Sequence, residues 1–224
     1  MTMLMLRDHL SLVLAAMLLA VGLGVPFGLA AYLYPKAGQM ILRLVDLIQT
    51  TPALALLGVI MVAMGPGKPT VVVGLALYSL LPIVRNTSLG LSQVPAYLKE
   101  AGDGMGMTRA YRLRHVELPL ALPMIFTGVR IAAVNAIGTA VFAAFVGGGG
   151  LGGVFYTAIR QKDLPLMLKG TAVLMVMALI LDLVLSAAER RLNDRRWRKP
   201  APSWLRWTGG VACAALCAGL LLFP

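Results

Sequence analysis

The sequence predicts an all-α membrane protein, and its composition is the first observation behind this prediction. Of its 224 residues, 59% are hydrophobic and only 13% are charged, and the mean hydropathy is +0.83. A soluble domain is about half apolar and about a quarter charged, so this chain has too few charged side chains to cover a soluble surface. The second observation is that the apolar residues gather in runs close to the ~20 residues that cross a bilayer as a helix.

Six apolar runs are the predicted membrane helices. The first is too long for the apolar part of a cleaved signal peptide, which has ~7–15 residues, and "GLAAYLYP" at its end has no small-x-small cleavage site, so a retained helix is expected. The third run is the shortest and reaches the length of a span if Pro69 and Arg85 lie at the two interfaces. The sixth opens with Trp204 and Trp207, which suit a membrane interface. The runs cover residues 10–32, 47–64, 71–84, 123–146, 171–188 and 204–223.

Basic residues predict how these helices are oriented. Fourteen of the 20 Lys and Arg fall on one side of the predicted spans, five fall on the other, and Arg130 lies within a span. Loops rich in Lys and Arg stay in the cytoplasm, so both termini are expected outside and residues 90–120 are expected to form a cytoplasmic loop. The net charge of +11 then reflects loops and contact with membrane lipid. Binding of nucleic acid is not expected, because aromatic residues are only 7%.

The long cytoplasmic loop has the composition of two short helices. Residues 97–101 and 109–116 favour helix, and Gly102, Gly104 and Gly106 lie between them. Glycine allows the backbone to turn sharply and allows another protein to approach closely. We therefore expect a tight bend at these glycines. The alternative is a solvated loop that its basic residues tether to anionic lipid.

The spacing within this loop resembles the EAA motif of ABC importer permeases, which is Glu-Ala-Ala, three residues, Gly, nine residues, Ile, one residue, Leu-Pro. This chain departs from it in having Gly102 in place of the second Ala and Val116 in place of Ile, and the extra glycine is expected to loosen the first short helix. The resemblance implies a type I ABC importer permease fold with a five-helix core, in which the motif docks on an ATPase subunit. The implied coupling residues are Glu100, Ala101, Gly102, Asp103, Gly106, Val116, Leu118 and Pro119.

Three further segments are similar to permeases for osmoprotectants, the group that imports glycine betaine, carnitine and choline. They read "IQTTPALALLGVIMVAMGPG", "LYSLLPIVRNT" and "IGTAVFAAFVGGGGLGG". Permeases for methionine share the five-helix core but fit these segments less well. An osmoprotectant permease is therefore expected, with a permease for methionine or another amino-acid-like solute as the alternative. A secondary transporter is a further alternative, although it would typically carry an internal repeat, and none is evident.

The resemblance also implies partners and domain boundaries. The chain would be a subunit of the bacterial inner membrane and not an enzyme, and ATP and Mg would be bound by a partner ATPase dimer. A second permease subunit, identical or related, and an extracytoplasmic solute-binding protein would complete the system. Residues 1–200 would form the permease domain. Residues 201–224 would form an additional helix outside the shared core, whose Cys213 and Cys217 are expected to face lipid.

Other chemistry is excluded by context. "GPGKPT" resembles the end of a phosphate-binding loop, but Pro69 stands where Ser or Thr is needed. The glycine-rich run that ends at Gly153 fits a dinucleotide-binding pattern, but it follows a membrane helix and not a strand. His9 and His115 fall on opposite sides of the membrane and cannot share a metal ion. No catalytic residue and no metal site is therefore expected.

Two charges inside the apolar runs are expected to form an ion pair. A charge within a span is costly and is usually paired or functional. Arg130 and Asp182 lie about two turns from the cytoplasmic ends of antiparallel helices, so their depths match. The pair is expected to fix helix packing, and a role in gating or translocation is the alternative. Asn135, in the same helix as Arg130, is expected to form a hydrogen bond between helices or to serve the pathway.

A run of glycines closes the fourth apolar run on the external side. Small residues in succession allow the backbone to hinge, so this segment is expected to move with an external gate. The candidate gate residues are Gly147, Gly148, Gly149, Gly150 and Gly152.

Overall fold

The computed structural model of the protein describes residues 3–194, and every regular element in this part of the chain is a helix. Most are α-helices, η1 is a π-helical turn and η2 is a 3-10 helix. In chain order they are α1 (Met3–Leu33), α2 (Pro35–Thr50), α3 (Ala53–Met64), α4 (Lys68–Ser92), α5 (Ala96–Gly104), α6 (Arg109–Arg112), η1 (Leu113–Glu117), α7 (Leu118–Thr139), η2 (Ala140–Val146), α8 (Gly152–Gln161) and α9 (Leu164–Asp194).

Four helical segments of the described chain are long and apolar enough to cross a membrane. They are α1, α4, the stretch Arg109–Val146 that contains α7, and Leu164–Arg190 of α9. These correspond to the first, third, fourth and fifth predicted spans. The short third run is the middle of the 25-residue helix α4, so that span is longer than its apolar run. The predicted sixth span, with Cys213 and Cys217, lies outside the described residues.

The prediction of one continuous membrane helix over residues 47–64 is wrong. The chain breaks after Thr50, and α2 and α3 meet at 99°, so they count as a fifth span only if the bent pair is taken as one. Pro52 causes the break, because proline disfavours helical backbone in the residue before it, and Thr51 is extended (φ −70°, ψ 133°). The hydroxyls of Thr50 and Thr51 donate to the carbonyl of Leu47 at 2.9 and 3.1 Å, which partly satisfies the end of α2.

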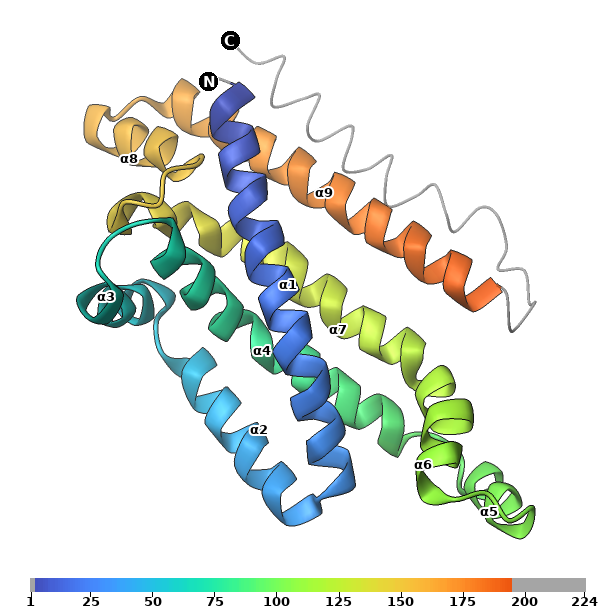
Figure 1. The fold of residues 1–224 in the computed structure, drawn as a ribbon. Coiled ribbons are helices and arrows are strands. Elements are labelled where there is room, and N and C mark those ends of the chain that lie inside the picture. The colour runs from blue at the N-terminus through green and yellow to red at the C-terminus, as the bar shows by residue number, and fades with distance from the viewer. Residues whose placement is uncertain (1–2, 195–224) are drawn as a thin grey trace.

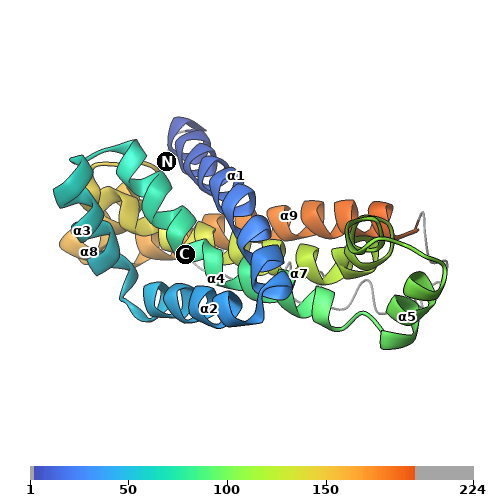
Figure 2. The same cartoon turned by 60° about the horizontal axis from the view of Figure 1, so that its bottom comes forward.

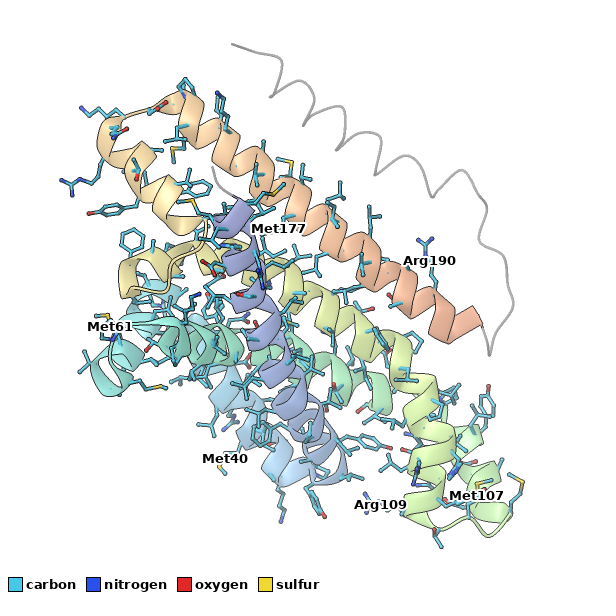
Figure 3. All side chains as sticks on the ribbon, turned by 45° about the horizontal axis from the view of Figure 1, so that its top comes forward. Met40, Met61, Met107, Arg109, Met177 and Arg190 are labelled. Atoms are coloured by element: carbon cyan, nitrogen blue, oxygen red, sulfur yellow. The ribbon has the colours of Figure 1, made fainter. Side chains whose placement is uncertain are left out.

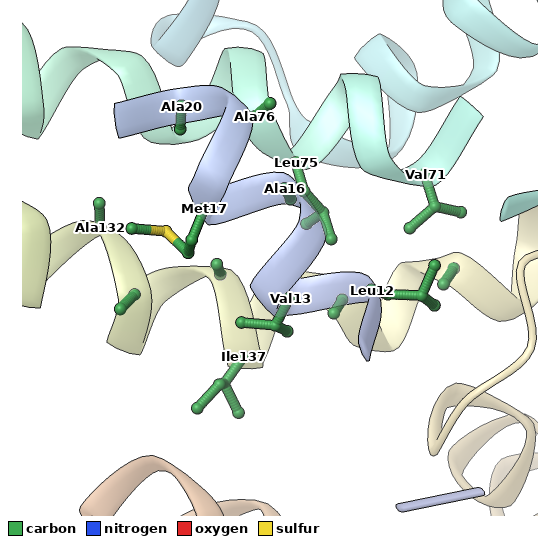
Figure 4. Packing of buried hydrophobic residues seen from close by; sticks show 14 of the residues in the cluster. Leu12, Val13, Ala16, Met17, Ala20, Val71, Leu75, Ala76, Ala132 and Ile137 are labelled. Atoms are coloured by element: carbon green, nitrogen blue, oxygen red, sulfur yellow. The ribbon is translucent and has the colours of Figure 1, made fainter. Parts of the chain in front are cut away.

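The core lies where α1, α4 and α7 meet, with α4 packed against both of the others. Figure 4 shows side chains of α1 inserted between those of α4 and α7. Between apolar helices in a membrane, small residues allow close packing. A Cβ added to Gly28 of α1 would lie 2.5 Å from Thr87 Cβ of α4, and one added to Gly128 of α7 would lie 2.6 Å from the Pro82 carbonyl oxygen. Close backbone approach therefore sets the positions of these three helices.

The two ends of the molecule have different elements. α5 and α6 lie at one end and α3 and α8 at the other, with the long helices between them (Figures 1 and 2). We call these the α5 end and the α3–α8 end. Figure 3 shows Met107 and Arg109 at the α5 end and Met61 far from them, on α3. The helix α8 was not expected from the sequence, because it is amphipathic and forms no long apolar run. Val154 and Ala158 are buried, whereas Tyr156 and Arg160 are exposed.

Candidate functional site

The segment that matches the EAA motif forms a helix, a tight turn and a second helical segment. The predicted interruption at Gly102 and Gly104 is wrong, because α5 continues through both. The bend is at Gly106, whose φ is +75°. The Met107 N–H donates to the Gly102 carbonyl at 3.0 Å, and the Gly106 N–H donates to the Asp103 carbonyl at 2.9 Å. These two bonds form a Schellman motif, in which the residue after the cap takes the left-handed conformation that glycine adopts without strain.

Gly102, the departure from the motif, is covered by a basic side chain. It is buried, and a Cβ at this position would lie 3.1 Å from Arg112 Cδ and 3.3 Å from Arg112 Cγ. The missing methyl group therefore leaves room for the stem of Arg112 to lie against α5. Arg112 ends α6, which Thr108 caps by accepting a hydrogen bond from the Tyr111 N–H at 3.3 Å.

A buried carboxylate organises the α5 end. Glu117, the last residue of η1, is 1% exposed. The Tyr32 hydroxyl, at the end of α1, donates to Glu117 Oε2 at 2.6 Å, and Arg112 Nε donates to Oε1 at 2.8 Å. Arg112 also pairs with Asp103 of α5. Both carboxylate oxygens are thus satisfied, as a buried charge requires, and the network joins α5, α6, α7 and α1.

Two further contacts hold α5 and α6 against α1. Lys99 Nζ lies 5.2 Å from the centre of the Tyr32 ring, a cation–π distance, and Arg109 Nη2 donates to the Leu33 carbonyl at 3.3 Å. Of the residues in this network, only Asp103 was expected from the motif. Tyr32, Arg112 and Glu117 were missed, although three charges at residues 103, 112 and 117 of an apolar chain were a visible signal.

The predicted coupling residues separate into an exposed and a supporting group. Glu100, Ala101, Asp103 and Gly106 are exposed, and Glu100 has no hydrogen bond or ion pair within the described part of the chain. Beside them, Tyr97 is 68% and Met105 69% exposed. The supporting residues lie further inside, where Leu118 packs against a core cluster. They are Gly102, Val116, Leu118 and Pro119.

The structure brings Arg130 and Asp182 together. Arg130 Nε and Nη2 donate to Asp182 Oδ1 at 3.0 and 2.9 Å. Arg130 Nη1 also donates to Glu189 Oε2 at 3.2 Å, a contact that sequence reasoning missed because the predicted fifth span ended at residue 188. Asp182 and Glu189 are seven residues apart, so they share one face of α9. The cluster joins α7 to α9, whereas the Asn135 side chain forms no hydrogen bond within the described chain.

The glycine run forms a turn that packs closely against α4 and η2. Gly147, Gly149 and Gly150 have φ between +75° and +77°. A Cβ on Gly148 would lie 2.3 Å from Val71 Cγ2, and one on Gly152 would lie 2.1 Å from the Val141 carbonyl oxygen. A hinge here would have to break these contacts, and the gate role remains a prediction.

A buried histidine connects this turn to α1. His9 Nε2 lies 3.0 Å from the Ile137 carbonyl oxygen, and the Leu151 N–H donates to His9 Nδ1 at 3.3 Å. Nδ1 accepts, so the ring proton is on Nε2, which donates to Ile137, and His9 is neutral. His115 lies at the α5 end, stacked on Tyr111 with ring centres 4.0 Å apart.

Known proteins resemble this chain over most of its length. The choline transport system permease protein OpuBB of Bacillus subtilis is 39% identical over 186 residues, which cover 83% of this chain and 86% of that protein. The osmoprotectant import permease protein OsmY of Salmonella typhimurium is 40% identical over 189 residues, covering 84% and 80%. Among solved structures, an inward-facing form of the MetNI methionine ABC transporter superposes with a TM-score of 0.75 at 21% identity, covering 86% of this chain and all of that one.

The fold, the motif segment and these similarities agree with one another. The superposition supports the type I permease fold that the motif implied. Residues 12–199 match the family described as binding-protein-dependent transport system inner membrane component. The chain therefore belongs to the family of inner-membrane components of binding-protein-dependent transport systems.

Proposed function

We propose that this chain is the permease subunit of an ATP-driven importer and forms the translocation pathway for an osmoprotectant such as glycine betaine, carnitine or choline. Its membership of the permease family supports the transport role. The substrate class is supported by relatives named as choline, glycine betaine/carnitine/choline and osmoprotectant permeases at 36–40% identity. ATP and Mg are bound by a separate ATPase dimer, and a solute-binding protein delivers the substrate.

The observation that carries this proposal is the exposed face of α5. Glu100 is an unpaired acid on a helix that the rest of the α5 end holds in place. Gly106 has no atom within 4 Å of an added Cβ, so a partner surface has open access to the turn. An unpaired charge beside an open turn suits docking of a protein with a basic or amide-rich groove. We assign this face to the ATPase, which places the α5 end in the cytoplasm and the N-terminus outside.

The buried network gives a physical route from docking to transport. α5 is tied through Asp103, Arg112 and Glu117 to the start of α7, and through Tyr32 to the end of α1. Displacement of α5 by the ATPase therefore displaces the cytoplasmic ends of α1 and α7 together. Because both helices pack on α4, this movement alters the packing around the pathway and opens it alternately to the two sides.

Charge reversal on α5 tests the proposal. The permease, its ATPase and its binding protein are reconstituted in liposomes, and ATP-driven uptake of glycine betaine is measured with methionine as the comparison solute. Glu100→Lys is expected to abolish co-purification of the ATPase and uptake, since like charges at a docking contact cost several kcal/mol. Lys169→Glu, the reverse charge change at an exposed site near the start of α9, is the matched control. Normal ATPase binding and uptake by Glu100→Lys, or uptake without any ATPase, would overturn the proposal.

A further inference from the structure

A pocket of about 470 Å³ lies beside the break between α2 and α3. Gln49, near the end of α2, forms one wall, Tyr78 of α4 a second, and Asn135, Thr139 and Phe142 of α7 and η2 a third. Tyr78 is ten residues beyond the start of α4 at Lys68, about 15 Å at 1.5 Å per residue. The pocket is therefore near the middle of a hydrocarbon core of ~30 Å.

The polar groups of this pocket are unusual for a lipid-facing surface. The side-chain amides of Gln49 and Asn135 form no hydrogen bond within the described chain, and Asn135 is exposed. Polar side chains within spans face other helices or a water-filled cavity and not lipid. Broken helices at membrane depth are likewise tolerated where they line a cavity. Two independent features thus indicate that this face contacts water: the amides without a hydrogen-bond partner in the described chain, and the helix break after Thr50.

The pocket favours a cation although it has no charged wall. None of the residues that line it is Asp, Glu, Lys or Arg. α2 ends beside Gln49, and the C-terminus of a helix has a partial negative charge. The rings of Tyr78 and Phe142 line the same space, and aromatic faces attract quaternary ammonium groups. The amide N–H groups of Gln49 and Asn135 are donors for a carboxylate.

We propose that this pocket is a weak binding site for a quaternary ammonium zwitterion within the translocation pathway. The α2 terminus and the two aromatic rings hold the ammonium group, and the two amides hold the carboxylate. Without a charged side chain the site releases its ligand readily, as passage requires. This inference rests on the proposed function, because it names the contacts of the same substrate class.

Transport kinetics test the aromatic contacts. In the reconstituted complex, Phe142→Ala and Tyr78→Ala are expected to raise the KM for glycine betaine uptake about tenfold, within the range of cation–π contacts, while ATPase co-purification stays at the parent level. Phe142→Tyr and Tyr78→Phe keep the rings and should restore uptake. Phe145→Ala is the matched control, since Phe145 lies in the same η2 segment, is 48% exposed and does not line the pocket. Parent kinetics in both alanine variants, or an equal loss in Phe145→Ala, would refute the site.

Chemical labelling tests the ligand directly. Asn135→Cys, in a chain with Cys213 and Cys217 replaced by Ala, is labelled with a maleimide in the presence of glycine betaine or of 3,3-dimethylbutyrate, its carbon isostere without the positive charge. Selective protection by glycine betaine is expected, and equal or no protection by the two would overturn the proposal. If the parent complex imports glycine betaine and these results fail, the pocket alone is wrong. If the parent imports methionine instead, the substrate assignment fails together with the pocket's ligand.

Discussion

The two ends of α1 are held in different ways. At the α5 end, Tyr32 and Leu33 contact Glu117 and Arg109, within a network of long charged side chains. At the α3–α8 end, His9 is held by backbone groups of Ile137 and Leu151, and a Cβ added to Gly150 of the glycine turn would lie only 3.2 Å from His9 Nδ1. Within the described chain, α1 forms one ion pair at this end, between Asp8 and Lys68, and it lies at the surface, so the buried contacts there are neutral.

This difference indicates different mechanical roles. Ionic side chains such as Arg112 have several rotatable bonds and keep contact while the groups they join shift. Backbone hydrogen bonds and close glycine packing have one geometry, because a packed interior resists small changes of volume. We therefore expect the α5 end to transmit movement and the α3–α8 end to anchor α1. Four sets of substitutions test this comparison, and they follow in order of their expected effect.

The largest effect is expected at the neutral anchor. In Gly152→Ala the new Cβ would lie 2.1 Å from the Val141 carbonyl oxygen, which forces the backbone apart, so the variant should not yield folded, monodisperse protein in detergent. Gly153→Ala is the matched control, since an added Cβ there meets nothing within 4 Å. Equal yields and melting temperatures for the two variants would contradict an anchor made by close packing.

The second largest effect is expected in the ionic network. Arg112→Met keeps the stem over Gly102 but leaves Glu117 buried without its cation, and an unpaired buried charge is strongly destabilising. ATP-driven uptake should fall more than about tenfold, and the melting temperature should drop. Arg114→Met, the same change at an exposed neighbour, should have little effect.

Partial recovery sharpens this prediction. Adding Glu117→Leu to Arg112→Met removes the buried carboxylate and should restore much of the melting temperature. Uptake should stay low, because the link from α5 to α7 is still missing. Recovery of uptake as well would show that the network only stabilises the fold.

A third, smaller effect is expected for the charges between α7 and α9. The double variant should lose less thermal stability than the sum of the losses in Arg130→Gln and Asp182→Asn. Each single variant should therefore lose more than half of what the double variant loses. The coupling energy should be about 1 kcal/mol, because the side chains are 31% and 32% exposed and water weakens the pair. Additive losses would contradict the pairing. A double variant that is stable but does not transport would favour a role in gating.

The smallest effect on stability is expected at the turn of the motif. Gly106→Ala puts a side chain on a residue with φ +75°, at a cost of about 1 kcal/mol, which is local to the end of α5. ATPase co-purification should weaken, because the added group stands in the open approach to the turn. Gly104→Ala, a helical position where an added Cβ meets nothing within 4 Å, is the control. If both variants melt and bind the ATPase alike, the Schellman turn is not needed for docking.

Much of the architecture was accessible from the sequence because it depends on local composition. The apolar runs predict the spans around α1, α4, α7 and α9, since transfer of a segment into a bilayer depends on that segment alone. The spacing from Glu100 to Pro119 indicated the family by itself. Local rules also had limits. Pro52 indicates the break between α2 and α3, but the span was predicted from the apolar run alone. The helix through Gly102 depends on the Arg112 stem that covers it.

The sequence by itself thus determined the membrane class, four of the spans and the segment that matches the EAA motif. Only the tertiary structure decided which groups meet across the bundle. Tyr32 and Glu117 are 85 residues apart, and His9 and Leu151 are 142 apart. The pocket of Gln49, Tyr78 and Asn135 likewise draws on three separate helices. Hydropathy and spacing act along the chain, whereas these contacts depend on how closely glycines allow α1, α4 and α7 to approach, which is a property of the packed helices and not of any one segment.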